Sequence, residues 1–141
     1  MTSPSEHTSW REFGCKDGTP YPDEWRVGRA LVLARAFEAI RADCGDKAIK
    51  ILSAYRTPAH NARVGGTRAS QHKEGRALDL RPPDGLTVYD FHARIKALAT
   101  ARPDLMIRGI GLYTSFIHVD VRPGERIAFW SGTRQAAEVP K

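Results

Sequence analysis

The segment SQHKEGRALDL, residues 70–80, decides how this sequence is interpreted, because it places a histidine and an aspartate on either side of a turn. His72 stands seven positions before Asp79, and Gly75 between them permits the chain to fold back on itself. The last four residues, ALDL, have the apolar character of a short buried strand. Two interpretations are open at this point: a polar pair on a surface loop, or two ligands of one metal ion.

A second segment, FIHVDV at residues 116–121, has the alternation of a strand with two different faces. Its three aliphatic residues share one face, which is expected to point into the core. His118 and Asp120 share the other face with Phe116. A strand surface that faces solvent more often carries Thr, Lys or Glu, so this mixed face has the composition of the floor of a site.

Together these segments supply two nitrogen ligands, from His72 and His118, and one oxygen ligand, from Asp79. Such a set is common for zinc and leaves a fourth position for water. Hydrolysis at a site of this kind also needs a group that takes and returns a proton, for which Asp120 is the candidate. The spacing alone is equally compatible with Asp120 orienting a ligand, or with scattered polar residues on the surface.

Arg56 is a further candidate because of its place in SAYRTPAHN, residues 53–61. It follows a predicted strand, IKILSAY at 49–55, and precedes Thr57 and Pro58, which have the pattern of a helix N-terminus. A guanidinium offers a planar fork to a carboxylate, or to a carbonyl that gains charge. In isolation Arg56 can equally be one of the many surface arginines of a basic chain.

The apolar periodicity predicts one small α+β domain with a mostly antiparallel sheet flanked by helices. The longest predicted helix spans residues 23–44, where apolar residues recur every three or four positions and Gly45 follows the last turn. A second long helix is predicted after Thr87, which has the pattern of a capping box with Asp90. The other predicted elements are an irregular arm from Trp10, a strand at 49–55, a short helix at 58–64, a strand at 77–80, a hairpin of strands at 109–113 and 116–121, and a further strand within 124–135.

The composition is that of a single globular domain, with 141 residues of which 41% are hydrophobic and 27% charged. The net charge of +6 fits either ordinary solubility or a polyanionic partner, such as nucleic acid or an acidic envelope polymer. No stripe of interleaved basic and aromatic residues is present, so no nucleic-acid partner is expected. No apolar run approaches the roughly 20 residues of a membrane helix, so no membrane insertion is expected.

The chain has two cysteines, Cys15 and Cys44. They lack CxxC spacing, which excludes a zinc site built on cysteines. A disulfide between them requires an oxidising compartment, and the polar start MTSPSEHTSW has no features of a secretory signal peptide. Two free, buried thiols are therefore expected.

Three motifs in this order resemble the zinc D-alanyl-D-alanine carboxypeptidase and endopeptidase family: SAYRTPAHN, SQHKEGRALDL and GIGLYTSFIHVDVR. The family pattern S-x-H-x-x-G-x-A-x-D is complete, as Ser70, His72, Gly75, Ala77 and Asp79. The resemblance extends from about Trp10 to Arg122. Members of the family act on bacterial cell-wall peptides, include phage endolysins, and are similar in fold to the signalling domain of hedgehog proteins. The resemblance implies the same fold for this chain.

The resemblance also implies roles for individual residues. His72, Asp79 and His118 would hold Zn²⁺, and Arg56 would hold the substrate and polarise the scissile carbonyl. Several members carry the catalytic carboxylate three residues before the last ligand, where this chain has Ser115. This chain follows the branch that ends in H-x-D, so Asp120 becomes the expected general base.

The expected function is that of a monomeric zinc metallopeptidase that cleaves an amide bond in peptidoglycan stem peptides or cross-bridges, as a carboxypeptidase or an endopeptidase. The alternative is a non-catalytic peptidoglycan- or metal-binding domain in which Ser115 marks a lost base. The domain is expected over residues 10–133, between a flexible tail at 1–9 and a C-terminal tail at 134–141. Synthesis in the cytoplasm and action on the wall after release, during phage lysis or from a virion, is the expected setting.

Overall fold

A five-stranded mixed sheet organises residues 2–132, the part of the chain described by this computed structural model. Its strands, in the spatial order β1-β2-β4-β3-β5, are β1 (Ile51–Ser53), β2 (Ala77–Leu80), β4 (Ile117–Asp120), β3 (Gly109–Leu112) and β5 (Ala128–Ser131). The pairs β1–β2, β2–β4 and β4–β3 are antiparallel, and β5 runs parallel to β3. The predicted α+β fold is confirmed, including the hairpin of β3 and β4 and the further strand near the C-terminus.

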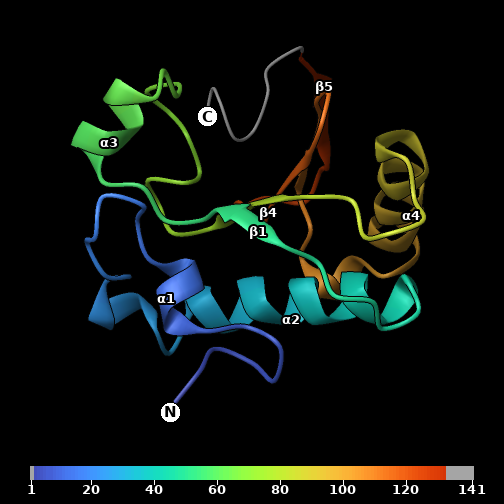
Figure 1. The fold of residues 1–141 in the computed structure, drawn as a ribbon, viewed down its shortest axis with the longest axis horizontal. Helices are drawn as coiled ribbons and strands as arrows, with labels where there is room; N and C mark the ends of the chain where they lie inside the picture. The colour runs from blue at the N-terminus through green and yellow to red at the C-terminus, as the bar shows by residue number, and fades with distance from the viewer. Residues whose placement is uncertain (1, 133–141) are drawn as a thin grey trace.

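Four helices and two 3-10 turns complete the described part of the chain. They are α1 (Trp10–Phe13), η1 (Asp23–Trp25), α2 (Arg29–Asp43), α3 (Pro58–Arg63), α4 (Val88–Ala101) and η2 (Pro103–Leu105). Figure 1 shows α2 running along one side of the sheet, with α4 and α3 at opposite ends of the molecule. The side chains of Thr57 and Thr87 accept hydrogen bonds from the third residues of α3 and α4, as their N-cap patterns predict.

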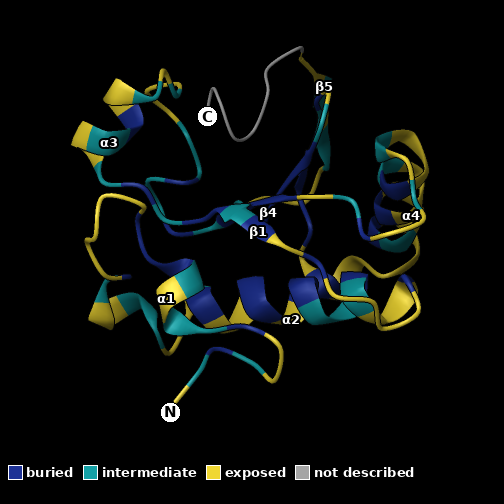
Figure 2. Ribbon diagram, viewed as in Figure 1, coloured by how far each residue is buried: buried dark blue, intermediate teal, exposed yellow. Residues whose placement is uncertain are grey.

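The hydrophobic core lies between the sheet and the two long helices, and Figure 2 shows buried residues where these elements meet. The core residues of β2 and β4 are Leu78, Leu80, Ile117 and Val119, each no more than 1% exposed. The helices contribute Ala30, Leu33, Ala34, Phe37 and Ile40 from α2, and Phe91, Ile95 and Ala99 from α4. Side chains alternate along a strand, so β2 and β4 turn Asp79 and His118 to the opposite face.

The helices differ from the prediction in two places. The predicted helix at 23–44 is divided, because the backbone at Gly28 (φ −130°, ψ −92°) is not helical and α2 begins only after it. The predicted irregular arm contains α1, a short helix whose first turn is closed by a capping box between Ser9 and Glu12.

Strand β1 is shorter than predicted because the backbone after it bonds elsewhere. The N–H of Tyr55 donates to the carbonyl of Phe13 (3.1 Å), and the N–H of Arg56 donates to the carbonyl of His72 (3.0 Å). These bonds satisfy backbone groups that would otherwise extend the strand. They also tie the segment before α3 to α1 and to the loop that carries His72.

The segment expected to form an N-terminal tail contacts α2. The hydroxyl of Ser5 and the ring nitrogen Nδ1 of His7 lie 2.6 and 2.7 Å from the carboxylate of Glu38. The C-terminal tail predicted at 134–141 lies outside the described residues. No helix in residues 2–132 is long and apolar enough to cross a membrane.

The turn between His72 and Asp79 depends on a glycine. Gly75 has φ +68°, and its carbonyl accepts a 2.7 Å hydrogen bond from the hydroxyl of Tyr21. An added Cβ would lie 2.7 Å from the Trp25 ring and 2.8 Å from that hydroxyl. The position therefore demands glycine for its backbone conformation and for its lack of a side chain.

Gly75→Ala is expected to lower the free energy of unfolding more than Gly18→Ala, measured by urea denaturation. Gly18 has φ +97° with open space around it, so alanine there meets only backbone strain of about 1–2 kcal/mol. Gly75→Ala adds overpacking of about 1–3 kcal/mol. Equal losses for the two variants would show that the aromatic side chains move aside at no cost.

Candidate metal centre

The carboxylate of Asp79 lies between two imidazoles. In the β2–β4 ladder Asp79 stands directly opposite His118, and the loop before β2 brings His72 to the same place. Oδ1 of Asp79 lies 3.1 Å from Nε2 of His72 and 3.2 Å from Nδ1 of His118. All three side chains are buried, and their ligand atoms lie within 4.8 Å of one another. The structure thus brings together the three residues predicted as metal ligands.

The hydrogen bonds of His72 establish which of its nitrogens faces the centre as a ligand. Its Nδ1 lies 2.6 Å from the carbonyl oxygen of Ala54. A carbonyl can only accept, so Nδ1 carries the proton and Nε2 presents a lone pair to Asp79. The loop is held by Ser70, whose hydroxyl accepts the N–H of His72 (3.2 Å).

His118 is oriented in the same manner by a carboxylate. Its Nε2 lies 2.7 Å from Oδ2 of Asp120, so this nitrogen donates and Nδ1 faces Asp79. Arg122 donates to both oxygens of Asp120, from Nε at 2.8 Å and Nη2 at 2.7 Å. Gly109 makes room for this carboxylate, because a Cβ there would collide with it. A histidine ligand whose other nitrogen donates to a carboxylate is the usual arrangement around protein-bound metals.

Three atoms with lone pairs therefore converge on one point: Nε2 of His72, Oδ1 of Asp79 and Nδ1 of His118. Such atoms repel one another unless a cation stands among them, and the cation is either a metal ion or an added proton. Burial acts to lower the pKa of His118, but hydrogen bonds to Asp120 and Asp79 raise it above its ordinary value. A proton and a metal thus compete for this place.

The pKa values of the other two groups suit metal ligands. Burial lowers the pKa of His72, in spite of the nearby carboxylate of Asp79, so its ring is neutral at pH 7. Burial acts to raise the pKa of Asp79, but His72 and His118 outweigh it and hold this pKa well below its usual range. Asp79 is therefore ionised, as a metal ligand must be.

Arg56 lies behind Asp79, away from the open side of the site. Its side chain is 1% exposed, and its Nη2 lies 3.3 Å from Oδ2 of Asp79, the oxygen that does not face the histidines. Its other nitrogens donate to Ser53 (3.2 Å) and Asn61 (3.3 Å). This geometry favours a role in orienting Asp79 over the expected contact with substrate.

The geometry of Asp120 likewise favours orientation over proton transfer. Asp120 is 1% exposed, and its two oxygens are engaged by His118 and Arg122. Burial acts to raise the pKa of Asp120, but Arg122 and His118 hold it well below its usual range. A carboxylate in these surroundings is a poor proton acceptor.

A cavity of about 300 Å³ opens onto the centre and is walled by aromatic rings. Tyr113 and Phe116 stack in parallel with their centroids 4.5 Å apart, and the indole N–H of Trp130 donates to the Tyr113 hydroxyl (2.8 Å). Arg122 lies over the Trp130 ring, 5.2 Å from its centroid. Asp79 is the only carboxylate among the described residues that line this cavity.

Several residues that line the cavity were not predicted as site residues, among them Gln71, Arg122 and Trp130. The alternation that puts His118 and Asp120 on one face of the strand extends to position 122, which is a usable sequence signal for Arg122. Trp130 reaches the cavity because β5 pairs with β3, where Gly111 leaves space for the indole. No local pattern in the sequence indicates that parallel pairing.

The fold and this centre fit the match of the chain to known families. The family model described as Peptidase M15 matches residues 7–120. The chain therefore belongs to the M15 peptidase family, which confirms the resemblance seen in its three motifs. A search of curated proteins found no match.

Asp120→Asn is expected to weaken metal affinity by about 10- to 100-fold, measured by competition with a fluorescent chelator. The amide cannot accept from His118 and from Arg122 as the carboxylate does. Asp84→Asn, at an exposed carboxylate, is the control and should leave affinity unchanged. An unchanged affinity in Asp120→Asn, with a loss of activity of about 10²- to 10⁴-fold, would instead identify Asp120 as the general base.

Arg56→Lys is expected to destabilise the protein by about 1–3 kcal/mol and to weaken metal binding, because one ammonium cannot reach Ser53, Asn61 and Asp79 together. Thermal unfolding and metal titration measure the two effects, with Arg81→Lys at an exposed arginine as the control. A variant of normal stability and metal affinity but reduced turnover would show that Arg56 acts on the substrate.

Proposed function

We propose that this chain is a zinc-dependent peptidase that hydrolyses an amide bond in peptidoglycan stem peptides or cross-bridges. The observation that carries the proposal is the convergence of two imidazole nitrogens and one carboxylate oxygen at the floor of an open cavity, in a member of a peptidase family. Action on the wall after release from the producing cell is part of the same proposal.

The ligand atoms fit zinc. His72, Asp79 and His118 would hold the ion, and two nitrogens with one oxygen match catalytic zinc sites that keep one position open. The far nitrogens of both histidines are already engaged by Ala54 and Asp120. A bound zinc ion supplies Lewis-acid polarisation of a carbonyl and activation of water.

The protein's own residues prepare the centre for that chemistry. Arg56 holds the outer oxygen of Asp79, and Asp120 holds the His118 ring, so neither ligand has to reorient during a reaction. Arg122 donates two hydrogen bonds to Asp120. A guanidinium has further N–H donors, and the Arg122 side chain is 31% exposed at the cavity, so donors remain for a ligand. We assign Arg122 the binding of a carboxylate of the stem peptide.

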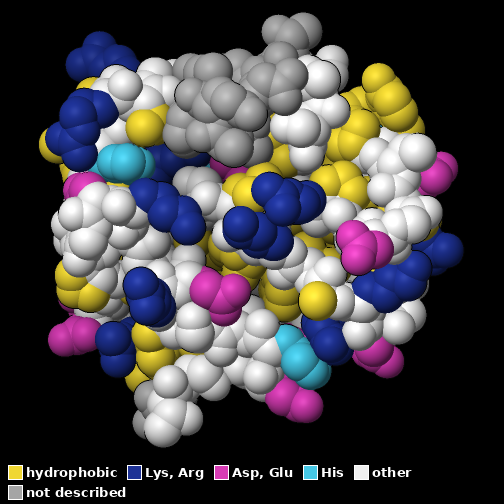
Figure 3. All heavy atoms as spheres, viewed as in Figure 1, with side chains coloured by type: hydrophobic (Ala, Val, Ile, Leu, Met, Phe, Trp, Pro, Cys, Tyr) yellow, Lys and Arg dark blue, Asp and Glu magenta, His cyan; other side chains and the backbone are white. Residues whose placement is uncertain are grey.

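The size of the cavity supports a small peptide as the substrate, and the charge of the molecule supports an anionic wall as its surroundings. The cavity lies at the lower end of the size range of small-molecule sites. The net charge of +6 favours an acidic polymer. On the face shown in Figure 3, basic side chains are spread among acidic and neutral ones rather than gathered into one stripe. This distribution suits a general attraction to the wall.

A non-catalytic binding domain is the second candidate. It is favoured by one observation: Asp79, a proposed metal ligand, is the only carboxylate among the described cavity residues. The position three residues before His118, where several relatives carry the catalytic carboxylate, is Ser115. The two candidates differ in whether covalent bonds of the wall are cut.

Mass spectrometry of defined muropeptides incubated with the protein is expected to reveal cleaved fragments. Release should stop on chelation and return on addition of zinc, because the three ligands hold the ion that activates the reaction. His118→Ala should release no fragments, and Asp84→Asn should match the wild type. Binding of the wall without any cleaved fragment would support the binding domain instead.

A further inference from the structure

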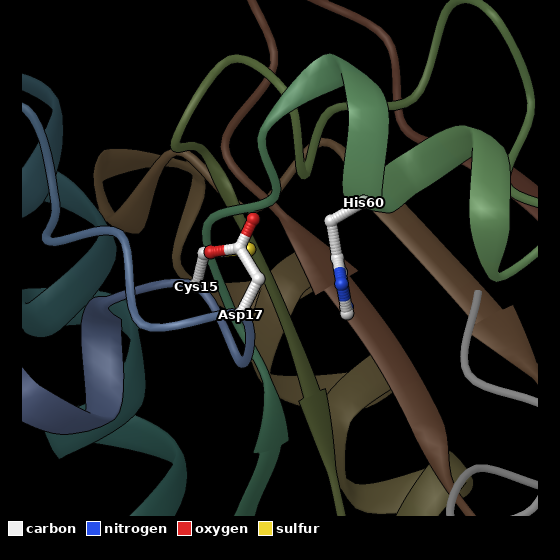
Figure 4. Close-up of side chains that lie close together, drawn as sticks. All are labelled: Cys15, Asp17 and His60. Carbon is white, nitrogen blue, oxygen red and sulfur yellow. The ribbon is translucent and has the colours of Figure 1, made fainter.

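A second cluster of metal-ligating side chains lies apart from the M15 centre. It consists of Cys15 and Asp17, on the arm between α1 and η1 (residues 14–22), and His60 of α3. One ligand atom from each residue lies within 4.8 Å of the others. Figure 4 shows the His60 ring extending from α3 on the side where Cys15 and Asp17 lie. None of the three has a role in the proposed reaction.

The donors of this cluster are a sulfur, an oxygen and a nitrogen. Cys15 is a free thiol and is 7% exposed. A thiolate and an imidazole select zinc, cobalt or cadmium over magnesium and calcium, which prefer oxygen ligands. The expectation from the sequence that no zinc site is built on cysteines rested on the spacing of the two cysteines. That spacing carries no information about a site in which one cysteine joins Asp17 and His60.

The cluster is held in place by hydrogen bonds around it. Oδ1 of Asp17 accepts the N–H of Thr19 (2.9 Å), and Oδ2 accepts the hydroxyl of Thr57 (3.0 Å). Thr57 also accepts the N–H of His60 (3.1 Å), so one threonine orients both ligands. A carboxylate has about four lone-pair sites, and these contacts leave some for a metal. Such outer bonds are typical of carboxylates that bind metals.

A cation already bridges two of the three ligands. Nη2 of Arg63 lies 3.9 Å from Oδ2 of Asp17 and 3.5 Å from Nδ1 of His60. The Arg63 side chain is 60% exposed, so a metal ion can displace it into solvent. Positive charge therefore already lies beside two of the three ligand groups.

We propose that Cys15, Asp17 and His60 form a second divalent-metal site of the zinc class, with one position left for water. The site joins the arm to α3, and α3 begins two residues after Arg56 in the chain. Because Tyr55 and Arg56 are bonded to α1 and to the His72 loop, a metal there stabilises the segment behind the M15 centre. Its role is to fix that segment.

Titration with Co²⁺ distinguishes metal binding at this site from metal binding at the M15 centre. A cobalt–thiolate bond gives charge-transfer absorption in the near ultraviolet, and His72, Asp79 and His118 include no sulfur. The wild-type chain is expected to bind two equivalents of Co²⁺ and to show this absorption. His118→Ala should keep the absorption while binding one equivalent, so failure of the proposed function and failure of this proposal are distinguishable.

Cys15→Ser is expected to lose the absorption and one equivalent of cobalt, and Cys44→Ser, at the other buried thiol, should retain both. His60→Gln, at a half-buried helix position, should lose the second equivalent even if Cys15→Ser fails to fold. Zinc should raise the melting temperature of His118→Ala but not that of His118→Ala combined with His60→Gln. The proposal is overturned if the wild type shows no thiolate absorption, or if the absorption survives in His60→Gln.

Discussion

The buried carboxylate of Asp79 is the constraint around which the molecule is arranged. One of its oxygens faces Arg56, and the other faces the ring nitrogens of His72 and His118. An ionised carboxylate with almost no exposure is costly unless positive charge and hydrogen-bond donors surround it. Arg56 meets part of this requirement from behind, and a cation on the open side meets the rest. That cation is either a metal ion or a proton on His118, and the three converging donor atoms make the centre a candidate metal site.

The same strands build the core and the centre. In β2, the side chains of Leu78 and Leu80 enter the core, while Asp79 between them points to the opposite face. The β2–β4 register places His118 against Asp79, so the packing that stabilises the sheet also sets the distance between these ligands. The loop ligand His72 needs separate support, which comes from the Ala54 carbonyl. Loss of sheet packing and loss of the metal centre are therefore expected to occur together.

Strand alternation predicts that His118 faces the site, because the side-chain direction in a strand follows from parity. The full set of His72, Asp79 and His118 is what the resemblance to the zinc peptidase family implies, and the structure brings these three residues together. The sequence could not predict which side chains Arg56 and Asp120 contact. Arg56 follows β1 and Asp120 is the last residue of β4, and their contacts with Asp79, Asn61 and Arg122 are seen only in the folded chain. Parallel pairing of β5 and the approach of the arm to α3 join distant segments, for which local periodicity carries no signal.

The most direct test of this account is a crystal structure with anomalous diffraction data collected at the zinc absorption edge. Zinc in this centre should give an anomalous peak contacted by Nε2 of His72, Oδ1 of Asp79 and Nδ1 of His118, with Asp120 bonded to the far nitrogen of His118. A peak contacted by Asp120 or by Nε2 of His118, or the lack of any peak beside Asp79 in crystals grown with zinc, would contradict it.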